Sequence, residues 1–247
     1  MQYQEYGKDK AETVFLLHGG GLSWWNYKDE AALLQSSYHV ILPILDGHAD
    51  SDRPFSTIED NASEIMSFID KHFGGSVLLI GGLSLGAQIL LEMMSQRANI
   101  CRYALVESAA VHPSRFTHAL IRPALASSYW LIRNKSFARI QFSSLHLQKE
   151  RFDEYYRDTC KIRKENMIAF LKANTAYSLK SSISGTTAKT LIIIGGRENR
   201  EIQQSAKTIS QAIRDSQIMV MPGLYHGEFS INQPERYMQT ITKMLEE

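Results

Sequence analysis

A serine flanked by glycines, Ser84, is the residue of this sequence best placed to act as a nucleophile. It is the centre of a G-x-S-x-G pattern that follows an apolar run at residues 77–80 and precedes a helical stretch at 87–96. A turn this tight between a buried strand and a helix strains the backbone of the serine, and side chains two residues before and after it would collide. The spacing therefore predicts an activated hydroxyl rather than a solvated serine in a glycine-rich turn.

A serine hydroxyl needs a base to take its proton, and the base needs a group to orient it. The candidate base is His226, in a loop between an apolar run at 218–221 and the last helical stretch. Of the eight histidines, only this one lies downstream of Ser84, outside the helical middle of the chain, in such a loop. We therefore predict that His226 is the general base and not a surface histidine.

Two glutamates compete for the role of the acid that orients the base. Glu198 stands four residues beyond a buried run that ends at residue 194, where a carboxylate could reach the histidine from the sheet edge. Glu107 directly ends the run at 103–106 and would point to the same edge. The sequence favours Glu198 and keeps Glu107 as the alternative; either could instead cap a helix or form a salt bridge.

An oxyanion formed by attack of the serine needs two N–H donors. Leu85, immediately after the nucleophile at the start of a helix, is predicted to supply one. The second is expected from the glycine run after the first buried strand, with Gly20 preferred and Gly21 or Leu22 as alternatives. His18, before these glycines, is expected to make structural hydrogen bonds.

The elements that would position these groups alternate between short apolar runs and amphipathic stretches. Such a pattern predicts a mostly parallel sheet with helices on both faces. Predicted strands lie at 14–17, 39–44, 77–80, 103–106, 190–194 and 218–221, with an edge strand at 2–6. Predicted helices lie at 27–35, 58–72, 87–96, 202–214 and from 234 onward.

The middle of the chain, residues 112–180, shows only helical patterns and is predicted to be an insertion between two strands of the sheet. It holds 13 Lys and Arg against 5 Asp and Glu, whereas the rest of the chain carries an acidic excess. This imbalance indicates either a solvated helical face or attraction of an anionic substrate or an acidic surface. Five aromatic residues are candidates for pocket lining or core packing: Trp24, Trp25, Tyr129, Trp130 and Phe137.

Composition limits the classes of protein that the chain can belong to. An apolar content of 44% and a net charge of +1 favour a globular protein and exclude nucleic acid as an expected partner. The first ten residues are polar and no apolar run reaches about 18 residues, so neither a signal peptide nor a membrane span is expected. Cys101 and Cys160 suggest neither a disulfide nor a metal site, which favours a cytoplasmic location.

These residues together resemble the α/β-hydrolase superfamily, in particular its small members with a helical lid. The resemblance rests on five motifs: residues 18–21, 46–51, 82–86, 194–198 and 225–227. Their order of serine, acid and histidine is also that of the superfamily. The resemblance implies a doubly wound α/β-hydrolase fold, with a core formed by 1–111 and 181–247 and a lid at 112–180. It also implies acyl-transfer chemistry without a metal or a cofactor.

Two residues depart from the usual pattern of that superfamily. Glu198 stands where an aspartate is usual, and its longer side chain keeps Glu107 open as the acid. Ala49 replaces a glycine in the turn at 46–51, which is tolerable if the backbone there has an ordinary φ.

The sequence therefore predicts a serine hydrolase, of the carboxylesterase or lipase type, that cleaves a small or medium ester, thioester or lactone through an acyl-enzyme on Ser84. The alternative is a receptor or binding module that keeps the hydrolase scaffold with little or no turnover. The exact substrate and the oligomeric state are not fixed by any motif in the chain.

Overall fold

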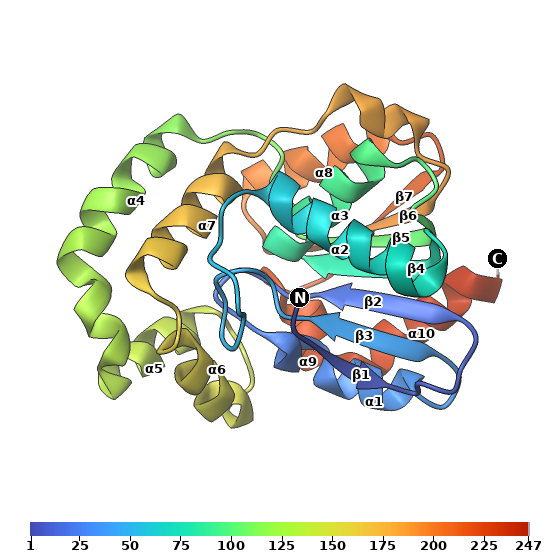
Figure 1. The fold of residues 1–247 in the computed structure, drawn as a ribbon. Coiled ribbons are helices and arrows are strands. Elements are labelled where there is room, and N and C mark those ends of the chain that lie inside the picture. The colour runs from blue at the N-terminus through green and yellow to red at the C-terminus, as the bar shows by residue number, and fades with distance from the viewer. Residues whose placement is uncertain (247) are drawn as a thin grey trace.

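The apolar runs of the sequence form the strands of one sheet (Figure 1). The computed structural model describes residues 1–246, and these contain a seven-stranded sheet of order β1-β3-β2-β4-β5-β6-β7. The strands are β1 (Tyr3–Tyr6), β2 (Thr13–Leu17), β3 (His39–Pro43), β4 (Val77–Leu83), β5 (Cys101–Glu107), β6 (Lys189–Gly195) and β7 (Ser216–Met221). All neighbouring strands are parallel except β1, which pairs antiparallel with β3. The predicted mostly parallel sheet is confirmed.

Helices cover both faces of this sheet, which explains why its central strands read as continuous apolar runs. Every residue of β2, β3 and β4 is buried. One apolar core lies under α2 (Ile58–Phe73), α3 (Leu85–Gln96) and α8 (Arg200–Ala212). A second core lies under α1 (Lys28–Leu34) and α10 (Pro234–Glu246).

Helix ends follow local capping signals in the sequence. The Thr57 hydroxyl accepts the Asp60 N–H at the start of α2, and Gly74 ends that helix in the left-handed conformation with φ +67°. Two details differ from the sequence prediction. The stretch at 27–35 divides into a 3₁₀ turn (Trp24–Tyr27) and α1, and a short helix, α9 (Glu228–Asn232), follows the candidate base.

The chain between β5 and β6 forms helices joined by loops and contains no strand within the described residues. It forms α4 (Arg115–Ser128), α5 (Lys135–Ser144), α6 (Phe152–Thr159) and α7 (Lys164–Ala176), joined by 3₁₀ turns that include η2 (Tyr129–Arg133). Figure 1 shows these helices gathered beside the end of the sheet to which the arrow of β2 points. The side-chain amide of Gln88 in α3 donates to the main-chain carbonyl of Asn174 in α7 and accepts from the Asn174 side chain. Arg151 forms an ion pair with Asp29 of α1. The role of this segment as a lid stays a prediction.

The aromatic residues of the sequence do not share one role. Trp25 is fully buried in the core, as the packing interpretation expects. Trp130 on η2 is 66% exposed and is therefore not packed in the core. Cys101 and Cys160 are both free thiols. Among residues 1–246, no helix is long and apolar enough to cross a membrane.

Candidate active site

Ser84 occupies the turn between β4 and α3 in a backbone conformation that L-residues seldom adopt. Its φ is +52° and its ψ is −108°, and it is the N-cap of α3. A Cβ on Gly82 would lie 2.5 Å from the Gly86 peptide, and one on Gly86 would lie 2.1 Å from the Leu17 carbonyl oxygen of β2. The two glycines of the motif are therefore required by contacts of the turn, as the spacing predicts.

Replacing Gly86 with alanine is expected to lower the free energy of unfolding by roughly 1–3 kcal/mol, because the added methyl group forces strand and helix apart. Gly185→Ala is the matched control, since nothing lies within 4 Å of a Cβ there. Urea denaturation of both variants measures the difference. Equal stabilities would show that the turn can widen without cost.

Gly20 and Leu85, the two residues expected to hold an oxyanion, lie next to each other. A Cβ on Gly20 would be 3.6 Å from the Leu85 Cβ, and Gly20 is exposed to solvent. Leu85 begins α3, so its N–H has no acceptor within the helix. The Leu22 N–H already donates to the Gly19 carbonyl at 3.1 Å, which removes Leu22 as an alternative donor.

The structure brings Glu198 and His226 together. Oε2 of Glu198 lies 3.6 Å from Nδ1 of His226; the carboxylate side chain is 1% exposed and the imidazole 47% exposed. Oε1 of Glu198 accepts the Gly195 N–H at 3.2 Å and the hydroxyl of Ser108. The carboxylate is thus held from one side and presents its other oxygen to the histidine.

The loops that carry these two residues are tied together through their backbones. The Arg197 N–H donates to the Leu224 carbonyl at 2.9 Å, and the Gly196 N–H donates to the Met221 carbonyl at 2.8 Å. A Cβ on Gly195 would lie 2.3 Å from the Leu224 oxygen, so only glycine allows this approach. The positions of the Glu198 and His226 loops relative to each other are therefore set by main-chain contacts rather than by flexible side chains.

Ser108 is a residue of the site that sequence reasoning missed. It follows the end of β5 with φ +56°, and its N–H donates to the Ile193 carbonyl of β6 at 3.0 Å. Its buried hydroxyl then reaches Glu198. The available signal was its position, one residue past a buried strand at the carboxyl edge of the sheet.

Glu107, the alternative acid, has different partners. Its Oε1 accepts the Ser230 N–H of α9 at 3.2 Å, and its carbonyl oxygen accepts the Ser84 N–H at 2.9 Å. Burial, together with the charge of nearby Glu198, raises the pKa of Glu107 to about 7. Its carboxylate therefore anchors α9 and is not in ion-pair contact with His226.

Leu83 joins the serine turn to the other loops of the site. A Cβ on Gly227, next to His226, would lie 3.0 Å from a Leu83 methyl carbon, and one on Gly19 would lie 3.3 Å from it.

Among residues 1–246, no hydrogen bond joins the Ser84 hydroxyl to the His226 ring. Such contacts are often long in a free enzyme and tighten when substrate binds.

His18 has the structural role that the sequence predicts. Its Nδ1 contacts the Gly19 carbonyl at 2.9 Å, and its Nε2 accepts the Leu45 N–H at 3.1 Å. Complete burial lowers the pKa of His18 to about 3, so the ring is neutral and can accept this bond. The loop that carries Gly20 is thereby fixed to the segment that follows β3.

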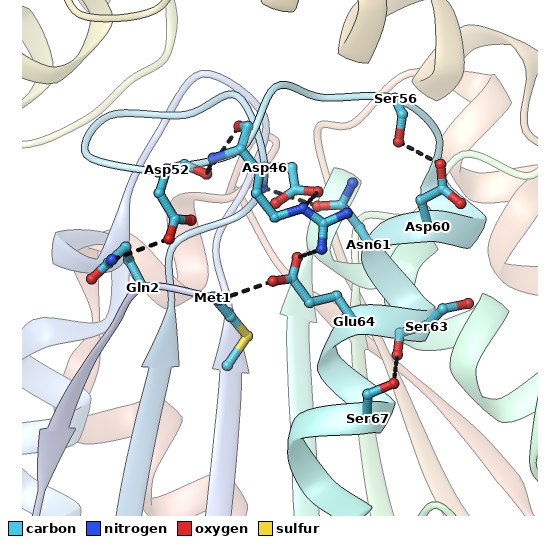
Figure 2. A network of polar contacts seen from close by, with 12 residues as sticks. Met1, Gln2, Asp46, Asp52, Ser56, Asp60, Asn61, Ser63, Glu64 and Ser67 are labelled. Carbon is cyan, nitrogen blue, oxygen red and sulfur yellow. Dashed lines mark hydrogen bonds and ion pairs between the residues drawn. The ribbon is translucent and has the colours of Figure 1, made fainter.

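The turn at residues 46–51 is held to α2 by a polar network (Figure 2). Arg53 bridges Asp46 at 3.6 Å and Glu64 at 2.7 Å, and the Asp46 N–H donates to Asn61 at 3.0 Å. Within this turn Ala49 has φ +33°. The condition under which the sequence makes Ala49 tolerable, an ordinary φ, is therefore not met, and the alanine lies in a backbone region that favours glycine.

A cavity of about 220 Å³ lies beside His226, between the β6–α8 loop and the end of α5. The His146 ring stacks on Tyr225 at 3.9 Å with an angle of 8° between the rings. The Arg197 guanidinium lies 5.5 Å from the centre of the same ring and donates to its hydroxyl at 3.3 Å. The helical segment thus supplies part of the wall next to the candidate base.

Comparisons with known proteins agree with the fold described above. A family model described as the alpha/beta hydrolase family matches residues 14–240. A thermophilic esterase from Thermogutta terrifontis superposes with a TM-score of 0.81 at 19% identity, covering 99% of this chain and 92% of that one. An esterase from Exiguobacterium antarcticum gives 0.83 at 17% identity, with 99% and 95% covered.

An enol-lactonase from Burkholderia xenovorans LB400 gives a TM-score of 0.77 at 16% identity, covering 100% of this chain and 96% of that one. None of the curated proteins compared with the sequence matches it significantly. At these identities the solved structures establish the fold, while the family model covers nearly the whole chain. With its parallel sheet and its serine turn at the end of β4, this chain belongs to the alpha/beta hydrolase family.

Proposed function

We propose that this hydrolase cleaves small or medium carboxylic esters, thioesters or lactones through an acyl-enzyme on Ser84. The observation that carries the proposal is the pair formed by buried Glu198 and solvent-accessible His226, 3.6 Å apart, on loops that end beside the serine turn. A carboxylate at Nδ1 keeps a proton on that nitrogen and leaves Nε2 free to act as the base. The esterases and the enol-lactonase among the similar structures support the ester class.

The proposed reaction has two halves with the same proton path. His226 takes the Ser84 proton while the serine oxygen attacks the carbonyl carbon, and the N–H groups of Leu85 and Gly20 hold the oxyanion. The carbon–oxygen bond of the ester breaks as protonated His226 gives its proton to the leaving alcohol. Water then loses a proton to His226 and attacks the acyl carbon. The bond from that carbon to the Ser84 oxygen breaks as His226 gives the proton to this oxygen, which releases the acid and restores Ser84.

Residues 112–180 are proposed to be the lid over this site, because α5 ends at the cavity beside His226 and α7 places Phe170 near Gly20. A Cβ on Gly20 would lie 3.4 Å from the Phe170 ring. Substrate selection would then depend on the helical segment. A cytoplasmic location stays a prediction.

A fluorophosphonate probe tests the proposal directly, since it reacts only with an activated serine. We expect stoichiometric labelling, mapped to Ser84 by mass spectrometry, together with turnover of p-nitrophenyl acetate, butyrate or octanoate. His226→Asn is the matched control and should remain unlabelled. Absence of labelling in the wild type would reject the hydrolase mechanism and favour a receptor that keeps the scaffold.

A further inference from the structure

The outer surface of α4, η2 and α5 exposes large apolar side chains. Phe116 is 77% exposed, Ile140 72% and Trp130 66%, the three highest values for large hydrophobic residues within 1–246; Leu120 is 48% exposed. Phe116 and Leu120 are one helical turn apart on α4, so they share a face. We call Phe116, Leu120, Trp130 and Ile140 the apolar surface.

These side chains are not needed to pack the helices that carry them. The only residue of α4 that is buried is Ile121, and α5 buries Ala138 and Phe142. Figure 1 shows α4 at the outer edge of the helical segment, with α7 between it and the sheet. Four large exposed apolar residues on three consecutive elements are more than single scattered ones, and such residues mark a surface that contacts something apolar.

The three elements that carry the apolar surface, α4, η2 and α5, bear ionisable side chains of one sign. The sequence has no Asp or Glu between Glu107 and Glu150. The exposed cations of α4, η2 and α5 are Arg115, Arg122, Arg133, Lys135 and Arg139. Lys135 lies 3.6 Å from Asp153 of α6, and the Arg139 guanidinium lies 5.3 Å from the Phe152 ring.

The combination of cationic and apolar side chains on these elements distinguishes between nucleic acid and an anionic bilayer as partners. Nucleic acid would use the arginines but offers nothing to Leu120 or Ile140. The headgroup region of a bilayer with anionic lipids matches both parts, because Trp and Phe enter the boundary with the acyl chains while Arg and Lys reach the phosphates. A cationic excess with exposed aliphatic residues is therefore complementary to such a bilayer.

We propose that α4, η2 and α5 form a docking surface for anionic lipid membranes, by which the protein binds peripherally. No residue of the candidate active site belongs to this surface, so the proposal stands independently of the proposed function. Of the two sequence interpretations of the charged segment, it favours attraction to an acidic surface over a merely solvated face.

Sedimentation with lipid vesicles tests the proposal on the full chain. We expect binding to vesicles of 70% phosphatidylcholine and 30% phosphatidylglycerol, no binding to pure phosphatidylcholine, and weakening as salt is raised. Substituting Phe116→Ser, Trp130→Ser and Ile140→Ser together should reduce the partition coefficient at least tenfold. The control Ile218→Ser with Val220→Ser, which removes exposed apolar residues of β7, should leave it unchanged.

The charge contribution has its own pair of variants. Arg115→Gln with Arg122→Gln should weaken binding severalfold, whereas Lys207→Gln with Arg214→Gln, exposed cations of α8 and the turn after it, should not. Vesicle binding that depends on the arginines but not on the apolar residues would overturn the proposal, because the apolar surface would then take no part in docking. Equal binding to neutral vesicles, or none to anionic ones, would also overturn it.

Tryptophan emission can be measured on the wild-type protein, so this test does not require that a multiply substituted variant folds. Trp130 is exposed and Trp25 is fully buried, so insertion into lipid should shift the emission of the wild type to shorter wavelength. Trp130→Phe should abolish that shift while retaining binding. A wild-type spectrum that stays unchanged at saturating anionic vesicles would contradict the docking geometry.

Discussion

Ser84→Ala is expected to lower kcat for p-nitrophenyl butyrate by about 10⁴- to 10⁶-fold, because it removes the atom that forms the acyl-enzyme. KM should change little, since the methyl group of alanine leaves the walls of the site in place. The residual rate would come from N–H groups such as those of Leu85 and Gly20, which can still polarise a bound ester. Steady-state kinetics, with a burst measured at high enzyme concentration, give both quantities.

Ser23→Ala is the matched control for the loss of a serine. Ser23 follows the glycine run, is fully buried, and its hydroxyl has no hydrogen-bond partner within residues 1–246. We expect kcat within a factor of about three of the wild type. If Ser84→Ala retained a tenth of the activity, another group would be the nucleophile.

Glu198→Gln is expected to lower kcat by about 10³- to 10⁴-fold, whereas Glu107→Gln should cost less than about tenfold. The amide at position 198 would lose the charge that stabilises protonated His226 and could hold the ring in the wrong tautomer. At position 107, a glutamine oxygen can still accept the Ser230 N–H, which is the contact that the carboxylate makes.

The two variants form a matched pair, because both remove a buried carboxylate at a strand end and both keep the shape of the side chain. Both purified proteins should therefore be compared at one pH near 8, where Glu107, with its pKa of about 7, is mainly ionised. A larger loss for Glu107→Gln than for Glu198→Gln would exchange the roles of the two residues.

The part of the site that the sequence predicts well is the part that backbone geometry controls. A serine between glycines after a buried strand has few structural solutions, and the structure shows the contacts that exclude a Cβ at Gly82 and Gly86. The meeting of residues from different strands follows from the same logic, since parallel strands joined by helices place their carboxyl ends at one edge.

What the sequence does not settle depends on side-chain directions between distant segments. Glu198 and Glu107 both follow strands that end at that edge, and only the position of the His226 loop brings one of them within 3.6 Å. Ser108 donates to Glu198, a residue 90 positions later, so no local sequence pattern predicts this contact. The exposure of Trp130 also could not be predicted from the sequence, because an aromatic residue in a helical stretch normally packs inward.

Selection for stability alone would not preserve serine at position 84, because its backbone has a positive φ. A non-glycine residue held at such a φ destabilises the folded chain by about 1–3 kcal/mol. Glycine at position 84 would relieve most of that strain. A library of this protein screened only for heat resistance should therefore accumulate glycine at the centre of the turn, so selection for stability at this position would remove the proposed nucleophile.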